Sequence, residues 1–338
     1  MFIEDHLINK AKAISGSIVL PESTDVRVLT AGAKIVETGL AKVTLLGKSE
    51  IIRQEAKALN IELQNITIID PETSENIPAF AEAYYQKRKE KGVTMHQALE
   101  TVKNPLYYGA FMVKEKQVDG MVAGAVNNTA DVLRAALQVI GVMPGFKTVS
   151  SAFILPVSDF RGEERIFLFA DCAVVPNPNS EQLADITMST AITRKAIIGD
   201  EPKVALLSFS TLGSAKHELV DKVTMAKAIL TERKVDFDFD GELQFDAALI
   251  PEVAKRKAPQ SSVAGNANTL IFPDLQAGNI GYKIAQYMGK IEAIGPIIQG
   301  LAAPVSDLSR GCSAEDIINT VAIILLLAEQ QKKEIKNT

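Results

Sequence analysis

Apolar and polar positions along the first part of the chain follow two periods. Short runs rich in β-branched residues predict buried strands, and longer segments with apolar residues three and four apart predict helices. The predicted strands are residues 17–20, 42–46, 66–70 and 120–125, and the predicted helices are residues 25–38, 50–60, 77–91 and 94–102.

The same alternation restarts after the Pro144-Gly145 turn. The predicted strands of this part are residues 148–155, 165–171, 203–208, 247–250 and 269–272, and the predicted helices are residues 180–198 and 220–232. Strands separated by helices of roughly 10–15 residues are typical of βαβ units. The sequence therefore predicts an α/β protein with parallel-rich sheets that are flanked by helices.

The chain length of 338 residues suggests two domains, at roughly 100–200 residues for each. No Ser/Gly-rich or Pro-rich linker separates them, and the strongest turn signals are Pro144-Gly145 and Gly295-Pro296. These positions predict an inserted middle domain, with the first and last segments of the chain folding together.

Composition and charge narrow the classes of partner. Lys and Arg number 36 against 41 Asp and Glu, and no basic run stands out, so we expect no nucleic-acid partner. The two cysteines lack a CxxC spacing, which excludes a disulfide framework and favours a reducing cytoplasm. The N-terminus has no signal-peptide core, and the longest apolar run, residues 321–328, is shorter than the ~20 residues of a membrane helix. We expect a cytoplasmic protein without a membrane partner.

The familiar cofactor signatures are missing from the sequence. It has neither GxxxxGK[ST] nor a GxGxxG after a strand, so no nucleotide cradle is predicted. His6, His96 and His217 are scattered and lack the HExxH spacing, and no metal site is predicted.

A polar loop with Ser309 and Arg310 leads directly into a predicted helix near the C-terminus. Ser313 and Asp316 have the spacing of a capping box. In one interpretation, the only role of Asp316 is therefore to accept a backbone N–H at the start of the helix. The same pattern also suits chemistry, because a helix N-terminus and an arginine bind phosphate, a serine donates to a developing oxyanion, and a carboxylate accepts a proton. The local pattern leaves both interpretations open.

A second candidate follows the strand predicted at residues 120–125. Thr129 and Arg134 lie in AVNNTADVLR, after the carboxyl end of a strand, where open α/β sheets bind ligands. Alternatively, Asn128 or Thr129 only caps the next helix and Arg134 faces solvent. Two weaker candidates are the Gly/Ser-rich turn at residues 208–216 and Arg88 in a basic helix end.

Several blocks spread from Ser17 to Asp316 closely resemble the phosphate acetyltransferases (phosphotransacetylases). They are AGAVNNTADVLRAALQVIG, FADCAVVPNPNSEQLADI, SFSTLGSAKHELVDKV, LIFPDLQAGNIGYKIAQ and SDLSRGCSAEDI. The resemblance implies a two-domain fold like that of the isocitrate and isopropylmalate dehydrogenases, with the active site in the cleft. The first domain would hold residues 1–147 plus 299–338, and the second, residues 148–298, would form a homodimer.

The resemblance also assigns site residues. The catalytic Ser-Arg pair and the Asp of the family fall on Ser309, Arg310 and Asp316, and its phosphate-binding or CoA-binding arginines fall on Arg134 and Arg88. Asn128 and Thr129 belong to the substrate-binding segment. The sequence departs from the family pattern at Asn128, Ala135 and Ser306, where Ser, Pro and Asn are usual, and none of these changes removes a charge.

The implied reaction is the reversible conversion of acetyl-CoA and phosphate into acetyl phosphate and CoA. We expect direct thiolate attack in a ternary complex, with Asp316 as base, Arg310 on the phosphate and Ser309 on the carbonyl oxygen. CoA is then a substrate, and no tightly bound cofactor is expected. The alternatives are a phosphate butyryltransferase and a non-catalytic domain that senses acetyl-CoA.

Overall fold

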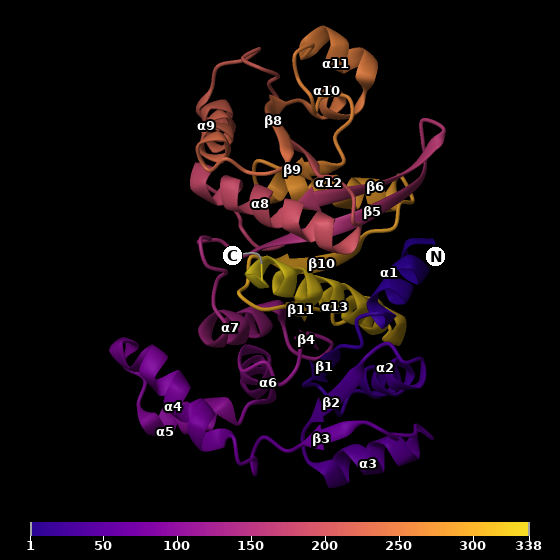
Figure 1. Cartoon of the computed structure of the whole chain (residues 1–338), viewed down its shortest axis with the longest axis vertical. Coiled ribbons are helices and arrows are strands. Elements are labelled where there is room, and N and C mark those ends of the chain that lie inside the picture. Colours follow the sequence, from indigo (N-terminus) through magenta and orange to yellow (C-terminus); the bar gives the residue numbers. More distant parts are fainter. Residues whose placement is uncertain (1, 337–338) are drawn as a thin grey trace. The chain divides into compact units, whose positions relative to one another are not determined.

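The computed structural model describes residues 2–336 and divides the chain into two compact units (Figure 1). Unit 1 holds the chain up to Gly141 and again from Leu301 onward, and unit 2 holds Val142–Gly300. The domain boundaries predicted at residues 147/148 and 298/299, and the cleft between the domains, stay predictions.

Unit 1 is built on a five-stranded sheet with the order β11-β4-β1-β2-β3, and all its strand pairs are parallel. The strands are β1 (Ser17–Leu20), β2 (Lys42–Leu46), β3 (Thr67–Ile69), β4 (Gly120–Ala123) and β11 (Val305–Asp307). From β1 the chain proceeds outward to β2 and β3, and then returns to β4 on the other side of β1. The direction of the strand order therefore reverses between β1 and β4, which is where open α/β sheets bind ligands.

The helices of unit 1 pack on both faces of this sheet, because successive side chains of each strand point to opposite faces. Gly32 of α2 (Val26–Glu37) packs near Leu20, so α2 covers the face to which Leu20 points. Gly109 of α6 (Pro105–Lys114) packs near Val19, the neighbouring residue of β1, so α6 covers the opposite face.

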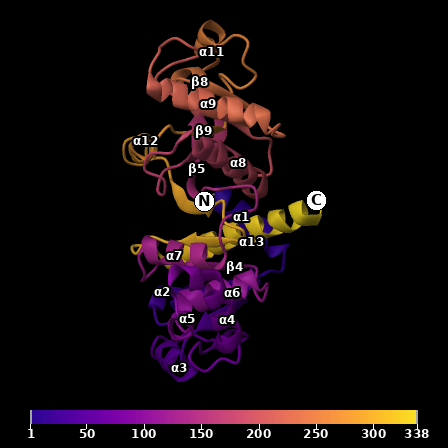
Figure 2. The same cartoon turned by 90° about the vertical axis from the view of Figure 1, so that its left-hand side faces the viewer.

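The remaining helices of unit 1 extend these two layers. Helix α13 (Ala314–Lys336) contacts α2, and α1 (Phe2–Lys12) lies beside α13 in both views (Figure 1, Figure 2). Helix α7 (Thr129–Val139) packs against α6. The other helical elements are α3 (Ser49–Ala58), α4 (Ile77–Arg88), the 3₁₀ turn η1 (Lys89–Lys91) and α5 (Met95–Val102).

Unit 2 contains a six-stranded mixed sheet with the order β10-β5-β6-β9-β7-β8. Its strands are β5 (Ser150–Phe160), β6 (Glu163–Ala170), β7 (Lys203–Leu207), β8 (Asp238–Leu243), β9 (Thr269–Ile271) and β10 (Ile294–Gln299). The pairs β10–β5 and β5–β6 are antiparallel, and the other pairs are parallel. Both units thus confirm the predicted α/β class with parallel-rich sheets.

Successive residues of β7 belong to two separate hydrophobic cores of unit 2, one on each face of the sheet. Val204 and Leu206 join the core that contains residues of α8 and α9, whereas Ala205 and Leu207 join the core on the other face. The helices of unit 2 are α8 (Ser180–Ile197), α9 (Glu218–Glu232), α10 (Phe245–Leu249), α11 (Pro251–Lys257) and α12 (Leu275–Tyr287).

One strand prediction is wrong. Residues 247–250 were expected to form a strand, but residues 245–249 form the short helix α10, which ends two residues before Pro251. An apolar run of four residues has no resolvable period, and its two alanines favour a helix. The strands β8, β10 and β11 and the helices α1, α6, α11 and α12 are not among the elements expected from the sequence.

The apolar run at residues 321–328 lies inside α13, and all eight of its residues are buried in unit 1. Among residues 2–336, no helix has the length and apolar character that crossing a membrane requires.

Candidate active site

Three loops follow the carboxyl ends of β1, β4 and β11, which are adjacent in the sheet of unit 1. They are residues 21–25, 124–128 and 308–313, and each leads into a helix. Because the three strands run in the same direction, their loops emerge at the same edge of the sheet. The predicted site residues Asn128, Ser309 and Arg310 are among them.

Glu22, in the loop after β1, organises the loop after β4. Its Oε2 accepts the backbone N–H groups of Gly124 and Ala125 at 2.9 and 2.8 Å. Its Oε1 accepts those of Val126 and Asn127 at 3.1 and 2.7 Å, and the Asn127 side-chain amide at 2.8 Å. The 8% exposed carboxylate of Glu22 is therefore saturated with hydrogen bonds and fixes the path of residues 124–127.

Arg27, in the first turn of α2, contacts both of the other loops. Its guanidinium donates to the carbonyl oxygens of Ala125, Arg310 and Cys312 at 2.7, 2.7 and 3.0 Å. Asp25, the N-cap of α2, accepts from the Nε and Nη2 atoms of Arg27 at 2.9 and 2.8 Å. One side chain thus connects the loop after β4 with the loop after β11.

Asp307 ends β11 and is only 3% exposed. Its Oδ2 accepts the hydroxyl of Thr129 at 2.6 Å, and its Oδ1 is buried without a hydrogen-bond partner. Burial raises the pKa of Asp307 to about 6, helped by the charge of Glu22 and opposed by the Thr129 hydrogen bond. Gly124 packs against this carboxylate at a φ of 110°, and a side chain there would collide with Asp307 and Leu308.

Ser309 and Arg310 are exposed in the loop that follows. The Ser309 hydroxyl accepts the backbone N–H of Gly311 at 3.3 Å, and the N–H of Cys312 donates to the Ser309 carbonyl at 2.9 Å. Within the part of the chain that the structure describes, no group pairs with the guanidinium of Arg310. Arg310 therefore has a fixed backbone and a cation that is available to a ligand.

Asp316 lies in the first turn of α13 and confirms the predicted capping box. Its Oδ2 accepts from the backbone N–H and the hydroxyl of Ser313 at 2.8 and 2.9 Å, and the Ser313 hydroxyl accepts the N–H of Asp316 at 3.1 Å. Asp316 is exposed, and its Oδ1 accepts no hydrogen bond from residues 2–336. One oxygen caps the helix, and the other remains open to a ligand.

Asn128 is the N-cap of α7. Its Oδ1 accepts the backbone N–H of Asp131 at 3.0 Å, and its amide donates to the Asp131 carboxylate at 2.7 Å. Arg134, on the same helix, is exposed and pairs with Asp131 at 2.5 Å. The capping interpretation of Asn128 is therefore confirmed, and the binding roles of Asn128 and Arg134 stay predictions.

Arg88 ends α4 and reaches the neighbourhood of Tyr107 on α6. Its Nε is buried and has no hydrogen-bond partner in the described part of the chain. Burial raises the pKa of the Tyr107 hydroxyl, while the positive charges of Arg134 and Arg88 act in the opposite direction. Both predicted substrate-binding arginines are thus close enough to Tyr107 to act on it.

The thiol of Cys312 is buried in the loop before α13, 3.8 Å from Nη1 of Arg27. Burial raises the pKa of Cys312, although the charge of Arg27 lowers it. The thiol is therefore less ready to form a nucleophilic thiolate than a free cysteine.

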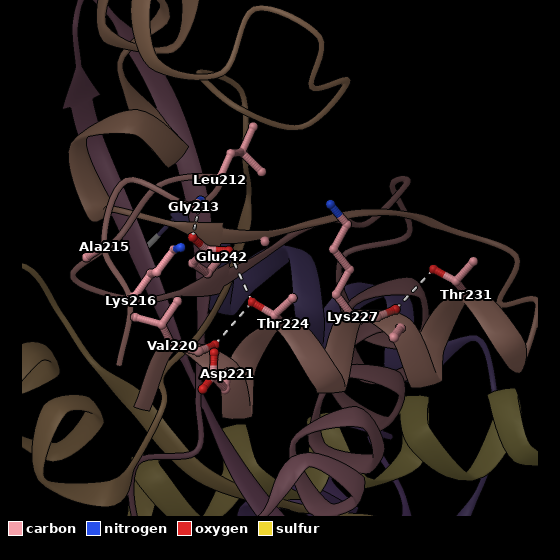
Figure 3. A pocket seen from close by; sticks show the side chains of 12 residues that line it. Leu212, Gly213, Ala215, Lys216, Val220, Asp221, Thr224, Lys227, Thr231 and Glu242 are labelled. Carbon is pink, nitrogen blue, oxygen red and sulfur yellow. Dashed lines mark hydrogen bonds between the residues drawn. The ribbon is translucent and has the colours of Figure 1, made fainter. Parts of the chain in front are cut away.

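The Gly/Ser-rich turn at residues 208–216 lies in unit 2, beside a groove of about 730 Å³ along α9 (Figure 3). The backbone N–H of Gly213 and the hydroxyl of Ser210 donate to Glu242 Oε1 at 2.7 and 2.8 Å, and Thr224 donates to Oε2 at 3.3 Å. A carboxylate of the protein itself thus uses donors that a phosphate would need. This arrangement does not favour the predicted phosphate cradle.

Three residues of the assembly had not been singled out in the sequence: Glu22, Arg27 and Asp307. Their positions after β1 and at the end of β11 are a usable signal, because charged residues at strand ends often face a ligand site. Apart from Asp25, which pairs with Arg27, the hydrogen-bond partners of these side chains lie 98 or more residues away along the chain.

Known proteins similar to this chain were identified by sequence and by structure. The family model described as "Phosphate acetyl/butaryl transferase" matches residues 2–325. A phosphate acetyltransferase from Thermoanaerobacterium thermosaccharolyticum is 51% identical over 330 residues, which is 97% of this chain and 100% of that protein.

Two solved structures are similar to this chain in fold. A phosphotransacetylase from Streptococcus pyogenes superposes with a TM-score of 0.92 at 44% identity, over 97% of this chain and 98% of the other. A putative 4-hydroxythreonine-4-phosphate dehydrogenase from Salmonella typhimurium superposes with a TM-score of 0.54 at 13% identity, over 92% and 98% of the chains. The second likeness concerns the fold alone and agrees with the predicted dehydrogenase-like architecture.

Proposed function

Because the chain belongs to the phosphate acetyl/butaryl transferase family, we propose that its reaction takes place at the exposed Ser309–Arg310 loop of unit 1. The activity is that of a phosphate acetyltransferase, an acyltransferase that converts acetyl-CoA and phosphate reversibly into acetyl phosphate and CoA. We propose below which residues carry out this reaction and in which order its steps occur.

The unpaired guanidinium of Arg310 is the observation on which the proposal rests. A phosphate group needs a cation, and Arg310 offers a planar, bidentate partner that no carboxylate of the described chain occupies. Its backbone carbonyl is held at 2.7 Å by Arg27, so the side chain starts from a fixed point. Arg310 would bind the phosphate of acetyl phosphate and stabilise its charge as it leaves.

Ser309 precedes Arg310 and carries a hydroxyl that can donate to a ligand. Its oxygen accepts from Gly311, and this hydrogen bond leaves the hydroxyl proton free. During thiol attack the carbonyl oxygen of the acetyl group gains negative charge, and a donor placed on it lowers the barrier. Ser309 would provide this donor.

Asp316 would be the general base of the reaction. Its Oδ2 caps α13, but Oδ1 is open and can accept the thiol proton of CoA. The resulting thiolate attacks the carbonyl carbon of acetyl phosphate, and a tetrahedral centre forms. Its collapse breaks the bond to the phosphate oxygen, so that acetyl-CoA forms and phosphate leaves on Arg310.

Substrate binding would extend from this loop to α7 and α4. No residue of the described chain is recorded as accepting the backbone N–H groups of Thr129 and Ala130, which begin α7, and the free N–H groups of a helix N-terminus favour an anion. Asn128 and Thr129 would contribute through this helix start, since their side chains bond Asp131 and Asp307. Arg134 and Arg88 would bind phosphate groups of acetyl phosphate or CoA.

We also propose that the chain forms a homodimer through unit 2. Helix α12 and the residue after it expose four large apolar side chains with helical spacing: Ile280, Ile284, Tyr287 and Met288, at 53% to 81% exposure. A row of this kind on one helix is typical of a surface that a second copy covers. A cytoplasmic location is proposed on the two free thiols, Cys172 and Cys312.

The test of the site is an Arg310→Gln variant in an assay of phosphate-dependent CoA release from acetyl-CoA. We expect kcat to fall by at least ~10²-fold and the KM for phosphate to rise, as for other charge-stabilising groups. Arg53→Gln is the matched control, because Arg53 is an exposed arginine of α3 whose one hydrogen bond within the described part of the chain is to Ser49. Near-normal activity of Arg310→Gln would refute the site.

A further inference from the structure

The charged residues that follow β1 bond the backbone of both neighbouring loops. Glu22 accepts N–H groups of residues 124–127, and Arg27 donates to carbonyl groups of Ala125, Arg310 and Cys312. Ala125 is bonded from both sides, because its N–H donates to Glu22 and its C=O accepts from Arg27. The loop after β4 is therefore fixed relative to α2.

Arg27 uses every donor of its guanidinium in this arrangement. Nε donates to Asp25 Oδ1, and the two hydrogens of Nη2 serve Asp25 Oδ2 and the Ala125 carbonyl. The two hydrogens of Nη1 serve the carbonyls of Arg310 and Cys312. A guanidinium has five N–H donors in a rigid plane, and here all five are satisfied.

The loop that Arg27 holds has few other attachments. Its backbone is bonded to the rest of unit 1 by the N–H of Leu308, which donates to the Ala123 carbonyl at 2.8 Å. The contact from Cys312 to Ser309 lies within the loop itself. A side chain at Gly311 would meet only the Ser309 hydroxyl nearby, so packing does not confine the turn at Gly311, whereas the side chain of Cys312 is buried. The two bonds from Arg27 to the carbonyls of Arg310 and Cys312 thus tie the backbone of this turn to α2.

We propose that Arg27 is a positioning residue of the acetyl transfer reaction, which sets the Ser309–Cys312 turn against the loop after β4. The inference rests on the proposed roles of Ser309 and Arg310. Arg27 contacts the backbone of the reacting loop and leaves the Arg310 side chain free. A displacement of this turn by about 1 Å is enough to cost ~10²-fold in rate, because both groups must meet the same substrate.

A lysine cannot replace Arg27 in this role. Its ammonium has three donors on one nitrogen, so it cannot span the Asp25 carboxylate and three carbonyls that lie around a planar fork. Arg27→Lys keeps the charge and loses at least two of the hydrogen bonds. Arg27→Ala removes all of them, and since the side chain of Arg27 is 27% exposed, a guanidinium ion from solution can reach the vacated place.

Arg194 of unit 2 provides a matched control. Its guanidinium also pairs with a carboxylate, Asp200, and donates to two backbone carbonyls, those of Ile166 and Asn268, both at 2.9 Å. It is 2% exposed and touches none of the proposed site residues. Arg194→Lys therefore tests what loss of a guanidinium anchor does to stability alone.

The experiment measures kcat, the KM for phosphate and acetyl-CoA, and Tm for the full-length Arg27→Lys, Arg27→Ala, Arg194→Lys and Arg310→Gln variants. We expect both Arg27 variants to lose about 10- to 100-fold in kcat with a smaller change in either KM. Added guanidinium, far below denaturing concentration, restores part of kcat in Arg27→Ala. Arg194→Lys lowers Tm and keeps kcat.

Three results would overturn the proposal: kcat of Arg27→Lys within twofold of the unchanged chain, a similar loss of kcat in Arg194→Lys, or no rescue of a folded Arg27→Ala by guanidinium. If Arg27→Ala does not fold, Arg27→Lys decides the question through kcat. The Arg310→Gln variant distinguishes failure of the Arg27 proposal from failure of the proposed site. If Arg310→Gln is inactive and Arg27→Lys is fully active, only the positioning role of Arg27 is refuted. If Arg310→Gln is fully active, the proposed site is refuted.

Discussion

The buried carboxylate of Asp307 gives a prediction about stability and pH. The substitution Asp307→Asn keeps the size of the side chain and an oxygen that can accept the Thr129 hydroxyl, but it removes the ionisation. In the unchanged chain, burial and the charge of Glu22 raise the pKa of Asp307 from 3.8 to about 6. The folded protein therefore holds the proton of Asp307 more tightly than the unfolded chain does.

The sign and size of the effect follow from this difference. Stability from the protonated carboxyl is fully present below pH 3.8 and is lost as the pH rises through about 6. A rise of this size corresponds to about 3 kcal/mol in total, at ~1.36 kcal/mol for each pKa unit. Between pH 5 and pH 8, roughly 1.4 kcal/mol of it is lost. Asp307→Asn does not titrate, so its stability relative to the unchanged chain should rise by that amount over this range.

Urea unfolding of both proteins at a series of pH values measures the effect. At each pH the unfolding free energy of the unchanged chain is subtracted from that of Asp307→Asn. The change of this difference with pH is the result, because a destabilisation by the amide that does not depend on pH cancels. Asp119→Asn is a control of opposite sign. Burial opposes ionisation of Asp119, but the salt bridge from Lys332 and the Ser17 hydrogen bonds outweigh it and lower its pKa. Its stabilisation is present above pH 3.8 and is lost as the pH falls.

A difference between Asp307→Asn and the unchanged chain that stays constant from pH 5 to pH 8 would refute the reasoning. A difference that shrinks with rising pH would mean that the pKa of Asp307 is lowered and that Thr129 outweighs burial.

Two further substitutions concern the reaction itself. Asp316→Asn keeps an oxygen that can cap α13 but cannot take a proton, so we expect kcat to fall by ~10²- to 10⁴-fold while Tm changes little; a normal kcat in steady-state assays would leave Asp316 with the capping role alone. Cys312→Ala should keep most of the activity, since the thiol is buried and its pKa is raised; loss of activity together with an acetylated Cys312 peptide in mass spectra of the unchanged chain would support a covalent route.

The sequence predicted those parts of the fold whose signals are local. The capping box at Ser313 and Asp316 can be read from four consecutive residues, and the structure shows both of its hydrogen bonds. The strand β8, with the sequence DFDGEL, has acidic residues at alternate positions and was missed, although its last four residues, 240–243, are all buried. Lys227 bonds the buried carboxylate of Asp240, and Ser210 and Thr224 bond that of Glu242. No local sequence pattern predicts these partners.

The same limit applies to the site. Ser309, Arg310 and Asp316 stand together in the sequence, so a loop before a helix was enough to select them. Arg27 became visible only in the fold, because its partners Arg310 and Cys312 lie more than 280 residues away. The pairing of charges with distant backbone groups depends on the strand order β11-β4-β1, which hydrophobic periodicity does not encode.

The central claim is that acetyl passes directly between CoA and phosphate at the Ser309–Arg310 loop, without an acetylated enzyme. Isotope exchange tests this claim most directly. The chain is incubated with acetyl-CoA and labelled free CoA after all phosphate has been removed, and the label in acetyl-CoA is measured before and after phosphate is added. Direct transfer predicts that label enters acetyl-CoA only once phosphate is present; label that enters in its absence would contradict the account.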